Sequence, residues 1–568
     1  MIAGPPQTAN GIFILLRRLR RPMIVLVVGY AVAVLGFTLV PGIDPLGRPW
    51  RMSFLHAFYF VSFLGTTIGL GEIPYPFSDA QRLWATASIY ATVIAWLYAI
   101  GGLFAVLQDP LFRRISHESG RYREVRRLRE PFYLLCGYDD TGYRVVHELC
   151  EEGVRVVVLD DDQSRVDAVD VDEHSTTVPA LVGDASDPRA LVIAGLTHPQ
   201  CAAVIALTGS DSINAKVTLT AHLLRPKLPV LSVARDHAWH PRLAAAGADA
   251  IINPFDSFAE RVAMSIRTPS LHVIYEALTT QAGTAAAQAP KVPRGRWVIC
   301  GWGLFARALR RQLHNLQIES ITVDSELDDS CDETNSLLGD PTDPEVLRRA
   351  GVDKAAALVA GTAVDIDNLA IVLAGRSINK QLYIVARQTQ RRNAEVFRAA
   401  PADLIMLSSY VVAAEMLRHL RDPLLSAFLR RARDEDEDWA AALLARLRET
   451  VGGDVLESWS LSVTAASLPA VCDALARGET VALERLLMRV DGSGEHMRAV
   501  ALLLQRGNER RLLPMLQEPL RVGDQVLFCG RALARTRMRG IALTRALAPA
   551  DSQHGDAAAA TADMGGAT

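Results

Sequence analysis

The chain has 568 residues, enough for three or four domains. Half of the residues are hydrophobic, 22% are charged and the net charge is −3. This composition is too apolar for an ordinary soluble protein and too polar for a multi-span transporter, so it favours a small membrane part on a large soluble part. The near-neutral charge gives no global basic field, and we expect no nucleic-acid partner.

Two long apolar stretches lie near the N-terminus. Residues 23–40 and 83–107 contain no charged residue. About 20 apolar residues in a helix cross the core of a bilayer. We therefore expect an outer helix over 23–40 and an inner helix over 80–107, and the alternative is a pair of buried helices in a soluble protein. The first stretch lacks a small-residue cleavage site and matches a retained helix better than a signal peptide.

Arginine residues flank the two stretches unequally. They are Arg17, Arg18, Arg20 and Arg21 before the first stretch, and Arg113, Arg114, Arg121, Arg123, Arg126, Arg127 and Arg129 after the second. Only Arg48, Arg51 and Arg82 lie between the two. Because Lys and Arg favour the cytoplasmic side, we expect a multi-pass protein of the bacterial inner membrane with both termini in the cytoplasm.

Between the spans, residues 67–71 read Thr-Ile-Gly-Leu-Gly after an aromatic-rich segment at 52–64. Potassium filters of the Thr-Val-Gly-Tyr-Gly type line a pore with backbone carbonyls, and glycine supplies the backbone angles that this needs. Irregular backbone at membrane depth is tolerated where it lines a water-filled path. The candidate filter residues are Thr66, Thr67, Ile68, Gly69, Leu70 and Gly71.

Outer helix, pore helix at 52–64, filter and inner helix together resemble the two-helix pore module of potassium channels. The resemblance implies K⁺ in the filter and a homotetramer, because the motif occurs once per chain and a filter needs four loops. Leu70 departs from the aromatic residue usual in the family, which leaves a weakly selective cation channel as an alternative. Gly101 and Gly102 are candidates for a gating hinge or, equally, for close helix packing.

From about Glu130 the chain alternates short β-branched runs with helical stretches, which predicts βαβ units and a parallel sheet. This pattern occurs twice. Residues 183–188 read Gly-Asp-Ala-Ser-Asp-Pro, and residues 339–344 read Gly-Asp-Pro-Thr-Asp-Pro. An apolar strand followed by an Asp and an Asn recurs with an offset of about 154 residues, as in Asn214 and Asn368. The soluble part is therefore predicted to be a duplicated domain.

Each copy opens with a strand, a Gly-rich turn, a helix and a second strand that ends in an acid. Together these features are typical of a Rossmann nucleotide-binding fold, in which the turn admits a pyrophosphate and the acid bonds a ribose. The acids Asp160 and Asp324 each lie 23 residues after the first glycine of their copy. The candidate nucleotide-binding residues are Gly137, Gly142, Asp160 and Asp184 in the first copy, and Gly301, Gly303, Ala306, Asp324 and Asp340 in the second.

The two Gly-rich turns differ at one position. The second copy has Gly303 where the first has Asp139. A carboxylate there adds bulk and repels phosphate, so the sequence favours the second copy for nucleotide binding. The alternative is that both copies are Rossmann folds without a ligand, kept for dimerisation and as a hinge.

The repeats resemble regulator-of-potassium-conductance (RCK) domains, which also occur in potassium-uptake regulatory subunits. We therefore expect an α-helical two-span pore module, two α/β Rossmann-like RCK domains and a C-terminal α+β lobe. The expected segments are 1–22 (cytoplasmic), 23–108 (pore module with filter 66–71), 109–130 (linker), 131–280 (first RCK domain), 281–295 (linker), 296–430 (second RCK Rossmann lobe and crossover), 431–548 (C-terminal lobe) and 549–568 (disordered tail).

The resemblance implies eight RCK domains in a cytoplasmic gating ring, governed by a small ligand such as NAD, NADH, ADP or ATP, or by Ca²⁺. Asp160 and Asp184 are the calcium candidates, while the acidic run at 434–438 lacks the spacing of a calcium loop and reads as a solvated turn. A membrane-tethered NAD-dependent oxidoreductase is the remote alternative. The sequence offers neither a Tyr-x-x-x-Lys motif nor a convincing His/Asp pair, and we expect no enzyme.

Overall fold

The computed structural model describes residues 6–69, 71–73, 75–108, 121–279, 292–327, 335–452, 456–489 and 495–543. Leu70, most of the expected linkers and the expected tail 549–568 lie outside the described residues. The chain forms two compact units, one made of Met1–Phe132, Val157–Asp167 and Val178–Cys201, and the other of the remaining residues.

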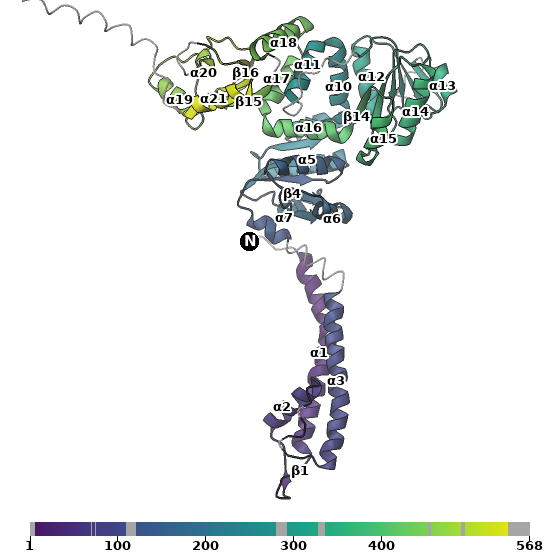
Figure 1. Cartoon of the computed structure of the whole chain (residues 1–568), viewed down its shortest axis with the longest axis vertical. Coiled ribbons are helices and arrows are strands. Elements are labelled where there is room, and N and C mark those ends of the chain that lie inside the picture. Colours follow the sequence, from purple (N-terminus) through teal and green to yellow (C-terminus); the bar gives the residue numbers. More distant parts are fainter. Residues whose placement is uncertain are drawn as a thin grey trace, which may run out of the picture. The chain divides into compact units, whose positions relative to one another are not determined.

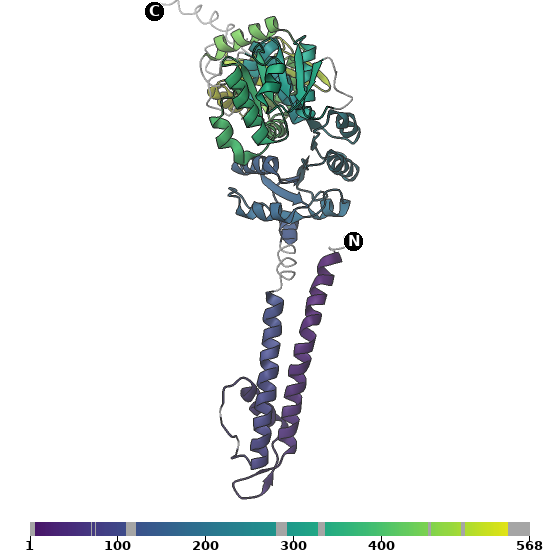
Figure 2. The ribbon, with the colours of Figure 1, turned by 90° about the vertical axis from the view of Figure 1, so that its right-hand side faces the viewer.

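Three helices make up the N-terminal part of the chain. Helices α1 (Pro6–Leu39) and α3 (Asp79–Leu107) run side by side, and the shorter α2 (Phe54–Gly65) packs against both, as Figures 1 and 2 show. A short antiparallel pair, β1 (Gly42–Ile43) and β2 (Pro49–Trp50), follows α1. The stretches Leu19–Leu39 and Asp79–Ala105 are long and apolar enough to cross a membrane.

Helix α1 begins well before the expected outer helix and continues through Pro22. Pro22 packs against Gly102 of α3, since a Cβ added there would lie 2.9 Å from Pro22 Cγ. A Cβ at Gly101 would meet no atom within 4 Å. Helix α3 stays helical through both glycines, so Gly102 serves close packing in this conformation and Gly101 is free of that constraint.

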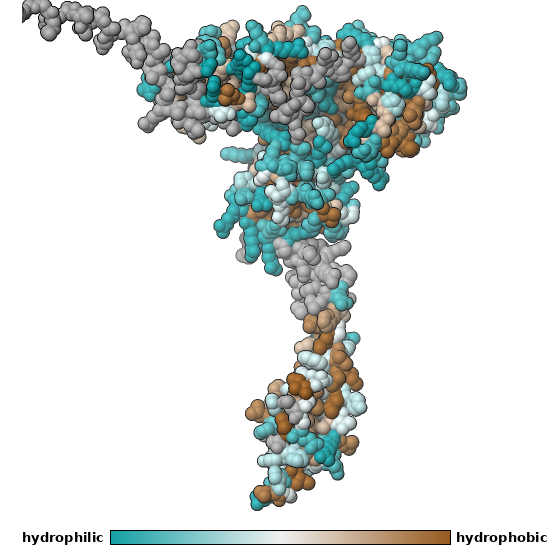
Figure 3. Space-filling model, viewed as in Figure 1, coloured by the Kyte–Doolittle hydropathy of each residue, from teal (hydrophilic) through white to brown (hydrophobic). Residues whose placement is uncertain are grey.

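The surface of α1 and α3 is strongly apolar. Brown residues are interspersed with pale and teal ones along this hairpin in Figure 3. Many large apolar side chains are exposed there, among them Val27, Leu83, Tyr90, Ile94 and Leu97. An exposed apolar surface of this extent is rare on a soluble monomer, because contact with water is unfavourable. The hairpin therefore needs lipid or other protein chains around it.

The first α/β domain contains a six-stranded sheet of order β5-β4-β3-β6-β7-β8, and the pairs β4/β5, β6/β7 and β7/β8 are parallel. Its strands are β3 (Phe132–Cys136), β4 (Arg155–Asp160), β5 (Ala180–Val182), β6 (Cys201–Ala206), β7 (Val230–Val233) and β8 (Ala250–Ile252). Its helices are α5 (Asp140–Glu151), α6 (Gln163–Val171), α7 (Pro188–Ile193), α8 (Asp211–Leu224) and α9 (His240–Ala245).

The second α/β domain repeats this arrangement, with the all-parallel order β11-β10-β9-β12-β13-β14. Its strands are β9 (Trp297–Cys300), β10 (Ser320–Asp324), β11 (Ser336–Leu338), β12 (Ala357–Ala360), β13 (Tyr383–Gln388) and β14 (Leu404–Leu407). Its helices are α12 (Leu304–Asn315), α13 (Pro344–Arg349), α14 (Asp365–Ile378) and α15 (Ala394–Ala399). In chain order both sheets run 3-2-1-4-5-6, the doubly wound order of dinucleotide-binding folds, which confirms the predicted fold class.

A pair of helices follows each sheet. They are α10 (Pro254–Arg267) and α11 (Pro269–Thr279) after the first, and α16 (Ser408–Arg421) and α17 (Pro423–Ala432) after the second. Each pair breaks at a proline, which cannot donate a helical hydrogen bond. Phe255 and Phe258 of α10 pack into the core of the second domain with Phe305. Residues of the first repeat therefore cover part of the second.

The C-terminal lobe is an antiparallel sheet of order β15-β18-β16-β17 with helices around it. Its elements are α18 (Glu437–Val451), β15 (Glu457–Ser462), α19 (Pro469–Ala476), α20 (Glu484–Leu487), β16 (Ala499–Arg506), β17 (Glu509–Leu512), β18 (Gln525–Gly530) and α21 (Ala532–Leu543). Separate apolar clusters lie on the two sides of this sheet. This is the α+β lobe that the sequence predicted.

Candidate functional site

The backbone of the filter segment alternates in conformation. Thr67, Gly69 and Gly71 have φ angles of +63°, +67° and +91°, whereas Ile68 lies outside the left-handed region. Such alternation turns successive carbonyl groups toward one side of the chain, as a carbonyl-lined ion path requires. Added Cβ atoms at Gly69 and Gly71 would meet nothing within 4 Å, so backbone angle alone demands glycine there.

Thr67 adopts the left-handed region although it carries a β-branched side chain. This conformation costs about 1–2 kcal/mol and persists where the surroundings hold it. The Thr67 amide donates to the Leu64 carbonyl at 3.2 Å, and the Ile68 amide donates to the Phe63 carbonyl at 3.0 Å. The C-terminal end of α2 thus fixes the start of the filter.

Two contacts brace the filter segment at its ends. A Cβ at Gly65 would lie 2.1 Å from the Tyr30 hydroxyl, so α1 packs tightly against the end of α2. Beyond the filter, Glu72 Oε1 accepts a hydrogen bond from Arg82 Nε at 2.9 Å, and Glu72 Oε2 accepts one from the Phe77 amide at 2.9 Å. This ion pair was not predicted from the sequence, although Glu72 and Arg82 are opposite charges that lie between two apolar stretches.

In the second α/β domain, the Gly-rich turn leaves the start of α12 open. Gly301 has φ +97°, and a Cβ there would lie 3.1 Å from backbone atoms of Gly361 and Thr362, so only glycine fits. Gly303 has φ −75°, and a Cβ there would meet nothing within 4 Å. No side chain among the described residues caps α12, whose first N–H groups and dipole can therefore serve an anion.

The acids of this domain lie beside the turn. Asp324 Oδ2 accepts a hydrogen bond from the Trp302 amide at 2.6 Å, and its Oδ1 accepts one from the Glu326 amide at 2.9 Å. The Gly339 amide donates to the Asp324 carbonyl at 2.9 Å, which brings Asp340 to the same edge. Asp340 accepts bonds from the Thr342 hydroxyl and amide, which lower its pKa. Asp324 thus contacts the Gly-rich turn, Asp340 follows the neighbouring strand end, and Ala306 is buried in the first turn of α12.

Arg387 of β13 joins this edge, and the sequence analysis did not identify it. Its Nη1 donates to the Thr362 carbonyl at 3.4 Å, and its guanidinium lies 5.0 Å from the centre of the Phe255 ring. Burial lowers the pKa of Arg387, and its buried Nε has no hydrogen-bond partner among the described residues. A partly buried cation with an unused donor is suited to an anionic ligand.

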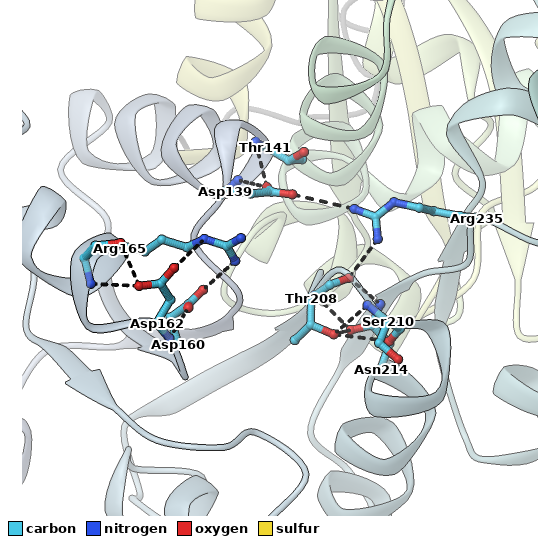
Figure 4. Close-up of polar contacts among 11 residues, drawn as sticks. Asp139, Thr141, Asp160, Asp162, Arg165, Thr208, Ser210, Asn214 and Arg235 are labelled. Atoms are coloured by element: carbon cyan, nitrogen blue, oxygen red, sulfur yellow. Dashed lines mark hydrogen bonds and ion pairs between the residues drawn. The ribbon is translucent and has the colours of Figure 1, made fainter. Parts of the chain in front are cut away.

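In the first α/β domain the corresponding helix end is already occupied. Asp139 Oδ1 accepts hydrogen bonds from the amides of Thr141 at 2.8 Å and Gly142 at 3.2 Å, and so caps α5 (Figure 4). Asp139 Oδ2 lies 3.6 Å from Arg235 Nη2, and Arg235 Nη1 donates to the Thr208 carbonyl at 3.2 Å. A protein carboxylate with its own arginine thus takes the place that a phosphate would fill.

The remaining candidates of the first copy are engaged locally. Asp160 Oδ1 accepts the Asp162 amide at 2.9 Å, and Arg165 lies 3.7 Å from each of these two carboxylates (Figure 4). Asp184 accepts the amide and hydroxyl of Ser186 at 2.7 and 2.9 Å. In the described part of the chain, no group of three or more His, Cys, Asp or Glu side chains is placed to hold a metal ion.

Known proteins share parts of this chain. The TrkA-N domain family model matches residues 133–254 and 297–408. "Potassium channel protein 1" of Methanocaldococcus jannaschii is 24% identical over 25% of this chain and 44% of its own length. "Voltage-gated potassium channel Kch" of Escherichia coli K12 is 23% identical over 36% of this chain and 48% of its own length. The chain thus spans less than half of either relative.

Among solved structures, the GsuK channel bound to NAD is 17% identical, covers 94% of this chain and 99% of its own, and has a TM-score of 0.46. Both curated relatives named above are potassium channels rather than enzymes. The two family matches coincide with the two doubly wound sheets. The TrkA-N domain model thus matches two tandem parts of this chain, and parts of the chain are similar to curated potassium channels.

Proposed function

We propose that this chain is the subunit of a homotetrameric, potassium-selective channel. The observation that carries the proposal is the positive φ at every second residue, Thr67, Gly69 and Gly71, in a segment between two apolar helices. Backbone carbonyls directed to one side can replace the water around K⁺, and four such loops complete a filter. Each chain contributes one loop, so four chains surround one pore.

The apolar hairpin of α1 and α3 spans the bacterial inner membrane, with both termini in the cytoplasm. Arginine residues are concentrated before the first span and after the second, as the positive-inside rule requires. The exposed apolar residues of the hairpin then face lipid or neighbouring subunits. The TrkA-N domains lie in the cytoplasm, where soluble nucleotides can reach them.

The gating ligand is a nucleotide with a diphosphate, such as NAD or ADP, bound to the second TrkA-N domain. Gly303 leaves the N-terminus of α12 open for the diphosphate, Arg387 supplies a partly buried positive charge, and Asp324 accepts a ribose hydroxyl. The capped α5 of the first domain disfavours a diphosphate there. One nucleotide per chain is therefore expected.

A bound nucleotide changes the open fraction only by binding one conformation more tightly than the other. The coupling is reciprocal, so channel opening must alter nucleotide affinity by the same factor. The contacts of Phe255 and Phe258 with the second domain can transmit such a change between the two repeats, because α10 belongs to the first repeat.

Bilayer recording of the purified full-length chain tests this proposal. We expect strong preference for K⁺ over Na⁺, and a change in open probability when NAD, NADH, ADP or ATP reaches the cytoplasmic face, with Ca²⁺ as a separate arm. Comparable K⁺ and Na⁺ permeability would instead indicate the weakly selective cation channel. If none of the five ligands changed the open probability, the gating assignment would be refuted.

The substitution Gly303→Asp tests the nucleotide site itself. It recreates the Asp139 arrangement, so a carboxylate caps α12 and competes with the diphosphate. We expect nucleotide affinity, measured by calorimetry, to fall about tenfold or more, with conduction retained. The matched comparison is Gly303→Ala, which adds a Cβ but no charge and no cap, and should lose less affinity than Gly303→Asp. Equal affinities of the Asp and Ala variants would contradict the assignment.

A further inference from the structure

A polar cavity lies among the crossover helices, and no residue of either Gly-rich turn lines it. Its volume is about 430 Å³, and residues from β8, α10, α16 and α17 line it. Arg418, Ser426, Arg430 and Arg433 are among them. The volume is at the small end of ligand pockets, which suits a compact metabolite better than a dinucleotide.

Three buried donors of this cavity have no hydrogen-bond partner among the described residues. They are Nε of Arg418, Nε of Arg433 and the hydroxyl of Ser426. Ser426 is only 5% exposed. Buried donors are almost always paired in folded proteins, because an unmade hydrogen bond loses the solvation of that group without replacement. Three such donors around one cavity point to a ligand that accepts hydrogen bonds.

The charges around the cavity favour an anion as that ligand. Arg430 is exposed at the cavity and forms no ion pair with any described residue, and partial desolvation together with the nearby Arg510, Arg433 and Arg418 lowers its pKa. Crowded guanidinium groups repel one another, and an added anion relieves that repulsion.

Of the four acidic side chains that line the cavity, Glu260, Glu415 and Asp256 have cationic partners, whereas Asp249 accepts only the Val230 amide at 2.8 Å among the described residues. Glu260 contacts Arg433, while Glu415 accepts a bond from Ser257 at 2.8 Å and lies 3.6 Å from Arg418. Asp256 bonds Arg311 at 2.6 Å and contacts His237 at 2.8 Å. Apart from Asp249, the unused capacity among these described residues therefore consists of donors and of the Arg430 charge.

We propose that this cavity binds a small oxyanion, carried by a phosphate or carboxylate metabolite, through Arg418, Ser426, Arg430 and Arg433. Helix α10 belongs to the first repeat, and helices α16 and α17 follow the second, so the ligand bridges elements of both. Its binding would fix how the two crossover pairs pack and would supply an input separate from the nucleotide site.

Calorimetry on the full-length chain, purified in detergent and chloride buffer, tests the proposal with inorganic phosphate and with succinate as separate probes. The Gly303→Asp background keeps either probe from the start of α12. We expect at least one probe to bind, and Ser426→Ala and Arg430→Ala each to weaken it about tenfold or more. The control Arg431→Ala, on the same helix but 61% exposed and near Asp434, should leave affinity unchanged.

Binding of phosphate alone would assign a phosphate ligand, and binding of succinate alone a carboxylate one. Failure of both probes to bind would overturn the proposal. Binding that both Ser426→Ala and Arg430→Ala leave unchanged would overturn it equally, because the anion would then lie elsewhere. Thermal unfolding of each variant checks its fold, and Ser426→Ala, which removes one hydroxyl, keeps the test valid if Arg430→Ala misfolds.

Discussion

Asp139 and Gly303 occupy corresponding positions of the two TrkA-N domains, two residues after the first glycine of each turn. The sequence predicted that Asp139 would disfavour phosphate. The structure supplies the reason, since the carboxylate bonds the same N–H groups that a phosphate would use. A single side chain thus distinguishes a self-capped helix from an open one.

The arginines beside these turns could not be predicted from the repeat. Arg235 and Arg387 donate to the equivalent carbonyls of Thr208 and Thr362. Under the offset of about 154 residues, however, Arg235 corresponds to Thr389. The two guanidinium groups therefore reach equivalent carbonyls from sequence positions that do not correspond in the repeat. Only the paths of the strands and side chains in the structure reveal this.

At the filter, Gly69→Ala tests the need for a left-handed residue. The φ of +67° costs a residue with a Cβ about 1–2 kcal/mol, and relaxation toward negative φ would turn a carbonyl away from the ion path. We expect loss of K⁺ conductance in bilayer recordings, with assembly retained on size exclusion. The control Gly101→Ala adds a Cβ in open space on α3 and should leave K⁺/Na⁺ selectivity intact. Normal selective currents from Gly69→Ala would refute the filter assignment.

Among the elements, α16 combines buried charge with a buried imidazole. Arg418 is paired with Glu415 and with the Tyr275 hydroxyl, the latter at 2.8 Å. Burial lowers the pKa of His419 below its ordinary value of 6.5, and its Nδ1 lies 2.9 Å from the Glu415 carbonyl. The helix therefore holds His419 neutral at pH values where an unfolded chain would protonate it.

This lowered pKa predicts how stability depends on pH. Near pH 6 the unfolded chain binds more protons at His419 than the folded chain does, so the free energy of unfolding falls as pH drops below about 6.5. We expect His419→Gln to lose less thermal stability than the parent between about pH 7.5 and 5.5. The exposed His314→Gln is the control and should follow the parent. If His419→Gln lost more thermal stability than the parent on acidification, the predicted direction of the pH dependence would be wrong.

In the C-terminal lobe, a buried carboxylate depends on one arginine. Asp524, whose side chain is 1% exposed, bonds Arg506 Nε and Nη2 at 2.9 and 2.8 Å. Removal of one partner leaves a buried charge uncompensated, so we expect Arg506→Ala to destabilise the lobe by about 3 kcal/mol in chemical denaturation. Arg477→Ala, at the more exposed pair with Glu479, should change the midpoint little. Similar midpoints for both variants would contradict this account.

At the scale of the whole molecule, one filter loop per chain makes the pore a shared structure. Co-expression of parent and Gly69→Ala subunits in equal amounts should leave about one sixteenth of the channels with four intact loops. We therefore expect K⁺ current per assembled channel to fall to roughly that fraction. A fall to only about one half would indicate pores formed within single chains, against the tetramer proposal.

Taken alone, the sequence determined the order and kind of the parts. The length of an apolar stretch and the periodicity of its residues are local properties of a sequence. The apolar stretches therefore predicted the spanning helices, and the strand–glycine–helix–strand–acid patterns predicted both Rossmann sheets. The fold class and the tandem domains agree with those predictions. The positive φ angles of Gly69 and Gly71 agree with the expected need for glycine there, whereas that of Thr67 could not be predicted from its residue type.

Only the tertiary structure decided which residues meet. The Glu72–Arg82 pair, the Arg387–Phe255 contact and the arginine-lined cavity join residues from separate elements, and chain separation does not encode such contacts. The burial of a side chain also depends on tertiary packing, because neighbouring residues exclude water from Ser426 and partly from Arg387. The sequence therefore determined what this protein is built from, and packing decided where its charges lack partners and where a ligand can complete them.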